Sequence, residues 1–183
     1  MSQINYKSGF VTISGLPNVG KSTLLNTLLN TNLSIVSPKP QTTRYHIKGI
    51  LTTQQYQIVF VDTPGYLSPR NQLEKMMKKE VLRAVKDDAD IVVVLTEPDL
   101  EVFKKKIDFF KFISEIKKPL IIAINKIDIY DEKTRNKFKK EIKSVFGERD
   151  LIEISAIKKQ NIDLLLRKII ELLPSLPPYY YDD

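Results

Sequence analysis

The feature that most constrains the fold is the alternation of short apolar runs with longer amphipathic segments along the chain. The runs, rich in Val, Ile and Leu, predict six strands, at 9–14, 46–53, 56–62, 91–96, 119–125 and 151–156. The segments between them predict helices at 21–30, 70–87, 102–116, 132–146 and 161–173. Continuous apolar runs are typical of strands buried on both faces. The pattern therefore predicts an α/β fold, with a six-stranded, mostly parallel sheet and helices on both faces.

One pair of strands departs from the parallel pattern. The strands at 46–53 and 56–62 are separated by only two residues, QQ, which is too short for a crossover, so we predict an antiparallel hairpin. After the last helix, the sequence PSLPPYYYDD predicts an extended arm rich in Pro and Tyr. We expect one domain over residues 1–174, followed by this arm at 175–183.

Composition narrows the chemistry. The 183 residues include no Cys and one His, which excludes disulfides, thiolate catalysis, Cys-ligated metals and multi-His metal sites. The net charge of +7 comes from lysines spread along the chain and favours a solvated surface, with weak nonspecific attraction to RNA or anionic lipid. The apolar runs are far shorter than the roughly 18 residues of a membrane span, and the N-terminus lacks the apolar core of a signal peptide. We expect a cytoplasmic monomer, with at most weak peripheral association at the inner face of the membrane.

A loop between the first strand and the first helix carries the strongest functional signal. Its sequence, GLPNVGKS, has the Gly-x-x-x-x-Gly-Lys-Ser pattern of the P-loop NTPases, in a context that an incidental Gly-containing turn would not explain. Glycine lets backbone N–H groups wrap closely around a polyphosphate, towards which the helix points its partly positive end. Lys21 is expected to contact the β- and γ-phosphates, and the Ser22 hydroxyl to bind Mg²⁺. The candidate nucleotide-binding residues here are Gly15, Leu16, Pro17, Asn18, Val19, Gly20, Lys21, Ser22 and Thr23.

A second motif predicts which nucleotide the loop serves. The sequence NKID, which contains Asn125, Lys126 and Asp128, lies at the end of the fifth strand, on the edge of the sheet where such folds bind ligands. The Asp128 carboxylate is placed to accept both N1–H and the 2-amino group of guanine, two donors that adenine does not offer. Lys126 is expected to lay its apolar stem along the base, and Asn125 to tie the strand end to the phosphate loop.

The segment after the sixth strand adds a weaker signal. Its residues are Ser155, Ala156 and Ile157, and the Ala156 N–H is expected to donate to guanine O6. Small residues before a turn are common, so this segment indicates a guanine contact only in combination with the NKID motif. A plain Lys-Asp turn is the alternative interpretation of NKID, and it is disfavoured because the motif falls at the expected strand end.

Two further segments predict a conformational switch. The sequence DTPG, which ends the third strand, comprises Asp62, Thr63, Pro64 and Gly65. Asp62 is expected to hold the Mg²⁺ shell and the Gly65 N–H to sense the γ-phosphate, although an Asx turn alone would also suit these residues. In the loop SPKPQTTRYH, Thr43, with Thr42 as second choice, is expected to complete the Mg²⁺ shell only while the γ-phosphate is present. This loop and residues 63–77 would form the two halves of the switch.

In order and spacing, GLPNVGKSTLLN, SPKPQTTR, DTPG, NKID and SA resemble the motifs of the translation-factor-related GTPases. Within that group, PKPQTTR resembles the Era type of bacterial ribosome-assembly GTPase, and the resemblance covers residues 5–178. It implies hydrolysis of GTP to GDP, and binding of small-subunit ribosomal RNA and the 30S precursor by the full-length protein. It also implies a C-terminal KH domain for RNA binding, and no GxxG clamp in a KH context occurs in the sequence. We therefore expect an excised GTPase domain, or a natural short form, without sequence-specific RNA binding of its own.

The catalytic residues implied by this resemblance are Lys21, Thr43, Gly65 and Asn18. Tyr66 stands where Ras-like proteins place the Gln that orients the attacking water, so slow intrinsic hydrolysis is expected. In related GTPases, an Asn at the position of Asn18 coordinates K⁺, which would stabilise the transition state in place of an arginine finger. The alternative is that Asn18 only tolerates an unusual backbone angle.

Three other functions are alternatives to a GTP hydrolase. The first is a nucleotide-gated binding module with negligible hydrolysis, which remains an alternative because Tyr66 stands in place of the water-orienting Gln. A tRNA-modifying relative would need an appended catalytic domain with a Cys or folate site. An adenine-nucleotide kinase would have no use for Asp128.

Overall fold

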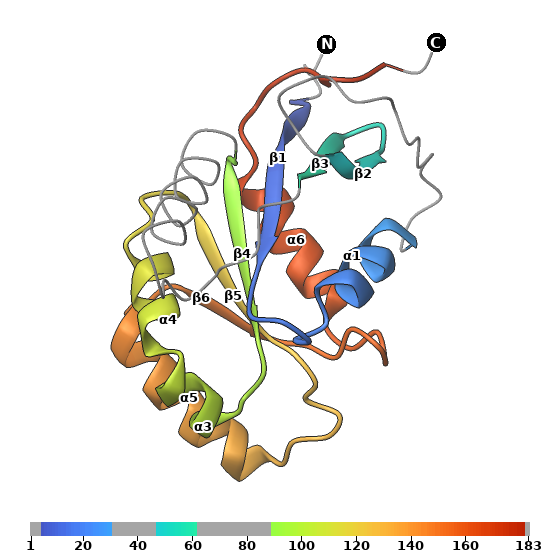
Figure 1. The fold of residues 1–183 in the computed structure, drawn as a ribbon. Coiled ribbons are helices and arrows are strands. Elements are labelled where there is room, and N and C mark those ends of the chain that lie inside the picture. Colours follow the sequence, from blue (N-terminus) through green and yellow to red (C-terminus); the bar gives the residue numbers. More distant parts are fainter. Residues whose placement is uncertain (1–4, 31–46, 62–88, 182–183) are drawn as a thin grey trace.

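The computed structural model describes residues 5–30, 47–61 and 89–181. A six-stranded sheet lies at its centre, and its strands are β1 (Lys7–Ser14), β2 (Ile47–Thr52), β3 (Tyr56–Val61), β4 (Ile91–Thr96), β5 (Leu120–Ile124) and β6 (Asp150–Glu153). The strand order is β2-β3-β1-β4-β5-β6, as Figure 1 shows. All neighbouring pairs are parallel except the β2–β3 hairpin. The predicted sheet and its antiparallel pair are confirmed.

The helices are α1 (Lys21–Asn30), α3 (Leu100–Lys105), α4 (Ile107–Ser114), α5 (Glu132–Phe146) and α6 (Ile162–Leu172). The α1 helix contacts α6, whereas α4 contacts α3 and α5, so the helices form the two groups visible in Figure 1. Both β4 and β5 are buried along their whole length, which requires cover on both faces of the sheet. The helix predicted at 70–87 lies outside the described residues. No helix in the described part of the chain has the length and apolar character needed to cross a bilayer.

Two elements differ from the prediction by more than a shift of one or two residues at an end. The single helix expected at 102–116 is two helices, because Lys106, with φ −111° and ψ 24°, leaves the helical range between α3 and α4. No Gly or Pro marks this break in the sequence. The strand expected at 151–156 ends at Glu153, and Ser155 instead pairs with Gln160 in an isolated bridge that turns the chain back.

The arm that follows α6 packs against the sheet of its own domain. In Figure 1 it is drawn in red and passes the upper end of β1, whereas the loop from β1 to α1 lies at the lower end. The buried Ser8 hydroxyl donates to the Pro177 carbonyl at 2.6 Å. The Gln57 side chain accepts from the N–H groups of Tyr179 (2.8 Å) and Tyr180 (3.0 Å) and donates to the Tyr180 carbonyl at 2.8 Å. A buried polar side chain on each of β1 and β3 therefore holds the arm in place.

Candidate nucleotide-binding site

The loop between β1 and α1 needs glycine at two points. A Cβ atom on Gly15 would lie 2.4 Å from the Leu95 carbonyl oxygen. Gly20 has φ +100°, and a Cβ atom there would lie 2.6 Å from Asn125 Nδ2. Across the loop, Lys21 Nζ donates to the carbonyls of Gly15 (2.6 Å) and Leu16 (2.9 Å). The loop is therefore compact, and the Lys21 side chain bonds back to the carbonyl groups at its start.

Asn18 lies in this loop with φ 64°, in the left-handed region that Asn tolerates better than most residues. Its backbone role, weighed above as the alternative to binding K⁺, is thus present in the structure. The Asn18 carbonyl also accepts a hydrogen bond from Lys126 Nζ at 3.0 Å, which links the phosphate loop to the NKID segment.

Asn125 joins three segments at the carboxyl edge of the sheet. Its Nδ2 donates to the Val19 carbonyl (2.9 Å), and its Oδ1 accepts from the Ala156 N–H (3.0 Å). The side chain is only 3% exposed, so both bonds form in a low-dielectric environment, where they are strong. The predicted tie between the strand end and the phosphate loop is present. The Ala156 N–H, predicted to donate to guanine O6, donates to Asn125 in this structure.

The Asp128 carboxylate is oriented by a buried serine. Ser155 Oγ donates to Asp128 Oδ1 at 2.8 Å and accepts from the Lys158 N–H at 3.2 Å. Ser155 itself is fully buried. Among the predicted site residues, Ser155 therefore lies behind the pocket and positions Asp128 rather than lining the pocket itself.

Sequence reasoning missed Thr27, which stabilises the same region from α1. Its hydroxyl lies 2.8 Å from the Thr23 carbonyl and 3.2 Å from the Ala156 carbonyl. Since α1 begins at the phosphate loop, this contact fixes the helix to the segment after β6. A threonine in a helix gives little warning of such a role in a sequence.

Sequence reasoning also missed Glu97, the residue directly after β4. The Glu97 carboxylate forms an ion pair with Lys126 through Oε1 and accepts from the Tyr130 hydroxyl through Oε2 at 3.0 Å. Burial, followed by the hydrogen bond to Glu97, raises the pKa of Tyr130 to about 12. The position of Glu97 could have indicated its role, because the carboxyl ends of β4 and β5 meet at one edge.

Two hollows lie at this edge, and neighbouring residues at the start of α1 line them. The first, of about 280 Å³, is lined by Gly20, Thr23, Asn125, Lys126, Asp128, Ile129, Ala156 and Ile157. The second, of about 450 Å³, is lined by Ile13, Lys21, Ser22, Leu25, Asn26, Lys48, Phe60 and Val61. The residues predicted to contact the base thus surround one hollow, and Lys21 and Ser22 open onto the other.

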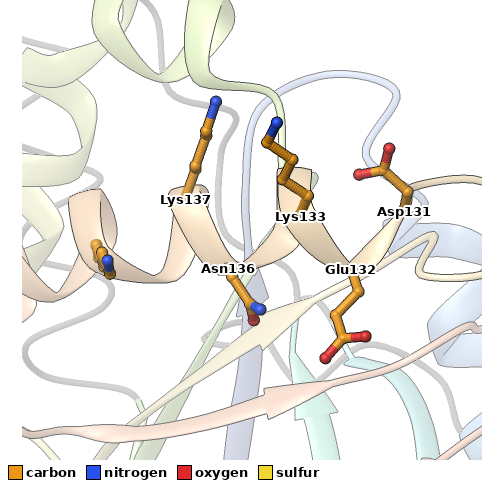
Figure 2. A pocket seen from close by; sticks show the side chains of 6 residues that line it. Asp131, Glu132, Lys133, Asn136 and Lys137 are labelled. Atoms are coloured by element: carbon orange, nitrogen blue, oxygen red, sulfur yellow. The ribbon is translucent and has the colours of Figure 1, made fainter.

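A larger hollow of about 570 Å³ lies elsewhere, on the surface of α5. Figure 2 shows that Lys133 and Lys137 point to one side of this helix, whereas Glu132 and Asn136 point to the other. Its polar groups do not converge on a common point, so it is a weaker candidate for a ligand site than the sheet edge. Asp62, Thr63, Pro64, Gly65 and Tyr66, together with Thr42 and Thr43, lie outside the described residues.

A parallel sheet that leads through a glycine-rich loop into α1, with an Asn-Lys-x-Asp segment beside that loop, defines a P-loop nucleotide-binding domain. The chain belongs to the 50S ribosome-binding GTPase family, whose model matches residues 10–126. It is 44% identical over 180 residues to GTPase Era of Thermoanaerobacter sp. (strain X514), with coverage of 98% of this chain and 59% of that protein. GTPase Era of Clostridium acetobutylicum is 44% identical over 178 residues, which are 97% of this chain and 60% of that protein.

Solved structures of Era are similar in fold. A point variant of Aquifex aeolicus Era bound to GDP·AlF4⁻ has a TM-score of 0.69 and 36% identity, covering 96% of this chain and 60% of that one. Era in complex with MgGDPNP and nucleotides 1506–1542 of 16S ribosomal RNA has a TM-score of 0.71 and 36% identity, covering 97% and 61%. These similarities confirm the resemblance to Era-type GTPases. The chain spans about 60% of the length of the relatives that it matches.

Proposed function

We propose that this chain is a GTP-binding and GTP-hydrolysing molecular switch of the Era type. One observation carries the proposal: Asn125 bonds to Val19 on one side and Ala156 on the other, while Ser155 orients Asp128. These contacts hold a phosphate loop and a base-reading carboxylate in a single rigid arrangement, which a binding site needs before its ligand arrives.

The base pocket suits guanine. Asp128 would accept from N1–H and the 2-amino group, whereas adenine would leave the carboxylate desolvated without donors. Ile129 and Ile157, at 69% and 73% exposed, line the same hollow and would flank the flat face of a base. Exposed apolar side chains beside a convergent polar group are typical of a ligand pocket.

The phosphates would lie over the loop and the start of α1. Lys21 would exchange its two carbonyl acceptors for β- and γ-phosphate oxygens, and Ser22 would bind Mg²⁺. We further propose Asp62 and Thr43 as Mg²⁺ ligands and the Gly65 N–H as the γ-phosphate sensor. The Era complexes with MgGDPNP and GDP·AlF4⁻ support these assignments by analogy.

The proposal for hydrolysis is that K⁺ at Asn18 stabilises the transition state, because Tyr66 does not replace the missing Gln. The backbone role of Asn18 makes an alanine variant ambiguous, since Ala would be strained at φ 64°. Asn18→Gly keeps this backbone angle and removes the side-chain ligand, so it is the sharper test.

The proposed biological role is in small-subunit ribosome assembly in the cytoplasm, where GTP- and GDP-bound forms would present different surfaces to a partner. The Era complex with a 16S ribosomal RNA segment supports this role. We propose that the chain acts as a monomer, that a KH domain outside residues 1–183 supplies RNA specificity, and that basic residues allow weak contact with anionic lipid at the inner membrane face.

Phosphate release from Mg·GTP, measured in KCl and in NaCl at equal ionic strength, tests the proposal. Faster release in KCl, lost in Asn18→Gly while GDP affinity is retained, is the expected result. Equal, near-zero release in both salts with tight GDP binding would contradict hydrolysis and favour the nucleotide-gated binding module. Absence of guanine-nucleotide binding would overturn the whole assignment.

A further inference from the structure

We propose that Glu97 is a positioning residue of the base pocket: it holds Lys126 against the phosphate loop and thereby sets how long a guanine nucleotide stays bound. The proposal rests on the proposed nucleotide site and deepens it. It adds a residue after β4 to a base pocket otherwise lined by the loops after β1, β5 and β6 and by the start of α1.

The contacts of Lys126 carry this inference. Its ammonium group bridges the Glu97 carboxylate and the Asn18 carbonyl, which belong to the loops after β4 and β1. Its backbone has φ 65°, so the residue is held in the left-handed region, which is unfavourable for lysine. With both ends fixed, Lys126 lines the 280 Å³ hollow, where its apolar stem would stack on a base.

Glu97 is itself rigidly held. Its Oε1 is taken by Lys126 and its Oε2 by the Tyr130 hydroxyl, so both carboxylate oxygens have fixed donors. Lys126 and Glu97 are 32% and 22% exposed at their side chains, so the pair is partly shielded from water. Without Glu97, the flexible Lys126 side chain would keep only the Asn18 carbonyl and would sample other rotamers. The pocket wall would then have to be ordered at each binding event.

A purely structural ion pair is the competing explanation, and the chain supplies a matched example. Glu153 is 23% exposed and also has two partners, at 3.1 Å each, in Arg135 and Lys139. It does not line the base pocket. Glu153→Gln therefore makes the same chemical change in a similar environment and serves as the control for Glu97→Gln.

The test is the dissociation rate of N-methylanthraniloyl-GDP from the full chain, chased with excess GDP in Mg²⁺ buffer. Glu97→Gln should release the nucleotide roughly five- to tenfold faster than wild type, as expected for loss of a partly shielded charged hydrogen bond. Tyr130→Phe should give a smaller acceleration, of about twofold. Glu153→Gln should leave the rate unchanged, even if it lowers stability.

Coupling to Lys126 separates positioning from general destabilisation. Lys126→Met keeps an apolar stem but removes the ammonium group, so adding Glu97→Gln to it should accelerate release no further. The preference for GDP over ADP should survive in Glu97→Gln, because Asp128 is untouched. A wild-type rate in Glu97→Gln, equal acceleration by Glu153→Gln, or additive effects with Lys126→Met would each overturn the inference. If wild type binds no guanine nucleotide, the proposed function fails instead.

Discussion

The two edges of the sheet use buried amide side chains for opposite purposes. At the amino edge, Gln57 is 1% exposed and bonds to the backbone of Tyr179 and Tyr180 in the arm. At the carboxyl edge, Asn125 is 3% exposed and bonds to Val19 and Ala156 in two loops that border a hollow. Gln57 fixes the C-terminal arm to the sheet, whereas Asn125 holds two loops at a fixed spacing on either side of a hollow.

Stability should therefore reside mainly at the amino edge, and nucleotide binding at the carboxyl edge. The arm packs against an apolar cluster on one face of β1, β2 and β3, formed by Phe10, Ile50, Val59 and Val61: Tyr180 contacts the cluster, and the Tyr179 ring lies edge-on to Phe10 at 4.8 Å. The arm thus buries apolar surface, and at the amino edge Gln57 satisfies its polar groups. The carboxyl edge instead arranges Lys126, Asp128 and Lys21 around hollows. Changes at one edge should therefore alter mainly unfolding, and changes at the other mainly binding.

The largest expected effect is at the carboxyl edge. Asp128→Asn replaces an acceptor of guanine by an amide that presents a donor to it, so GDP affinity should fall roughly 100-fold or more. Ser155 can still donate to the Asn oxygen, so the free energy of unfolding without nucleotide should change little. Fluorescence titration and urea unfolding measure the two quantities. Asp131→Asn, the same charge change at the N-cap of α5, should leave affinity intact.

The next largest effect is at the amino edge. Gln57→Leu keeps the approximate volume but leaves two N–H groups and a carbonyl of the arm without their partner, so the free energy of unfolding should fall by about 2–3 kcal/mol. GDP affinity should stay at the wild-type value. Gln55→Ala, in the exposed hairpin turn, is the control. A parallel loss of affinity in Gln57→Leu would show that the two edges are not independent.

A pair of glycines sharpens the comparison at a smaller scale. Gly20 and Gly147 both have positive φ, so alanine should destabilise each by about 1–2 kcal/mol. Only at Gly20 would the new methyl meet another group, Asn125 Nδ2, because nothing lies within 4 Å of a Cβ on Gly147. Gly20→Ala should therefore also weaken GDP binding, and Gly147→Ala should not. Equal binding by both variants would contradict the role given to Asn125.

The smallest expected effect is in alkaline solution. The folded-state pKa of Tyr130 is raised from 10.0 to about 12, so the protonated phenol stabilises the fold fully below pH 10. That contribution should be lost as the pH rises from about 10 to 12. Urea midpoints across this range should fall more for wild type than for Tyr130→Phe. Identical pH dependence of the urea midpoints in wild type and Tyr130→Phe would contradict a stabilising hydrogen bond from Tyr130 to Glu97.

Much of the fold could be predicted because buried strands are recognisable in the sequence as continuous apolar runs. The antiparallel hairpin follows from its two-residue connection, and Asn125 was found because it belongs to a motif with a fixed place on the sheet. The break at Lys106 could not be predicted, since no residue there is incompatible with a helix.

Gln57 and Glu97 were missed for a related reason. Each is one polar residue in an ordinary context whose partners lie far along the chain, 122 and 123 residues away for the arm and 29 for Lys126. Local patterns do not identify such partners. The place of Glu97 directly after β4 indicates the carboxyl edge, but only the folded sheet shows that Glu97 pairs with Lys126 and that Gln57 bonds to the arm.

Competition between unlabelled GDP and ADP for the chain loaded with N-methylanthraniloyl-GDP tests most directly whether the carboxyl edge reads guanine. The carboxyl edge, as described, should accept GDP at least about 100-fold more tightly than ADP, because only guanine offers Asp128 two donors. Equal displacement by the two nucleotides would contradict a guanine-reading site at Asp128.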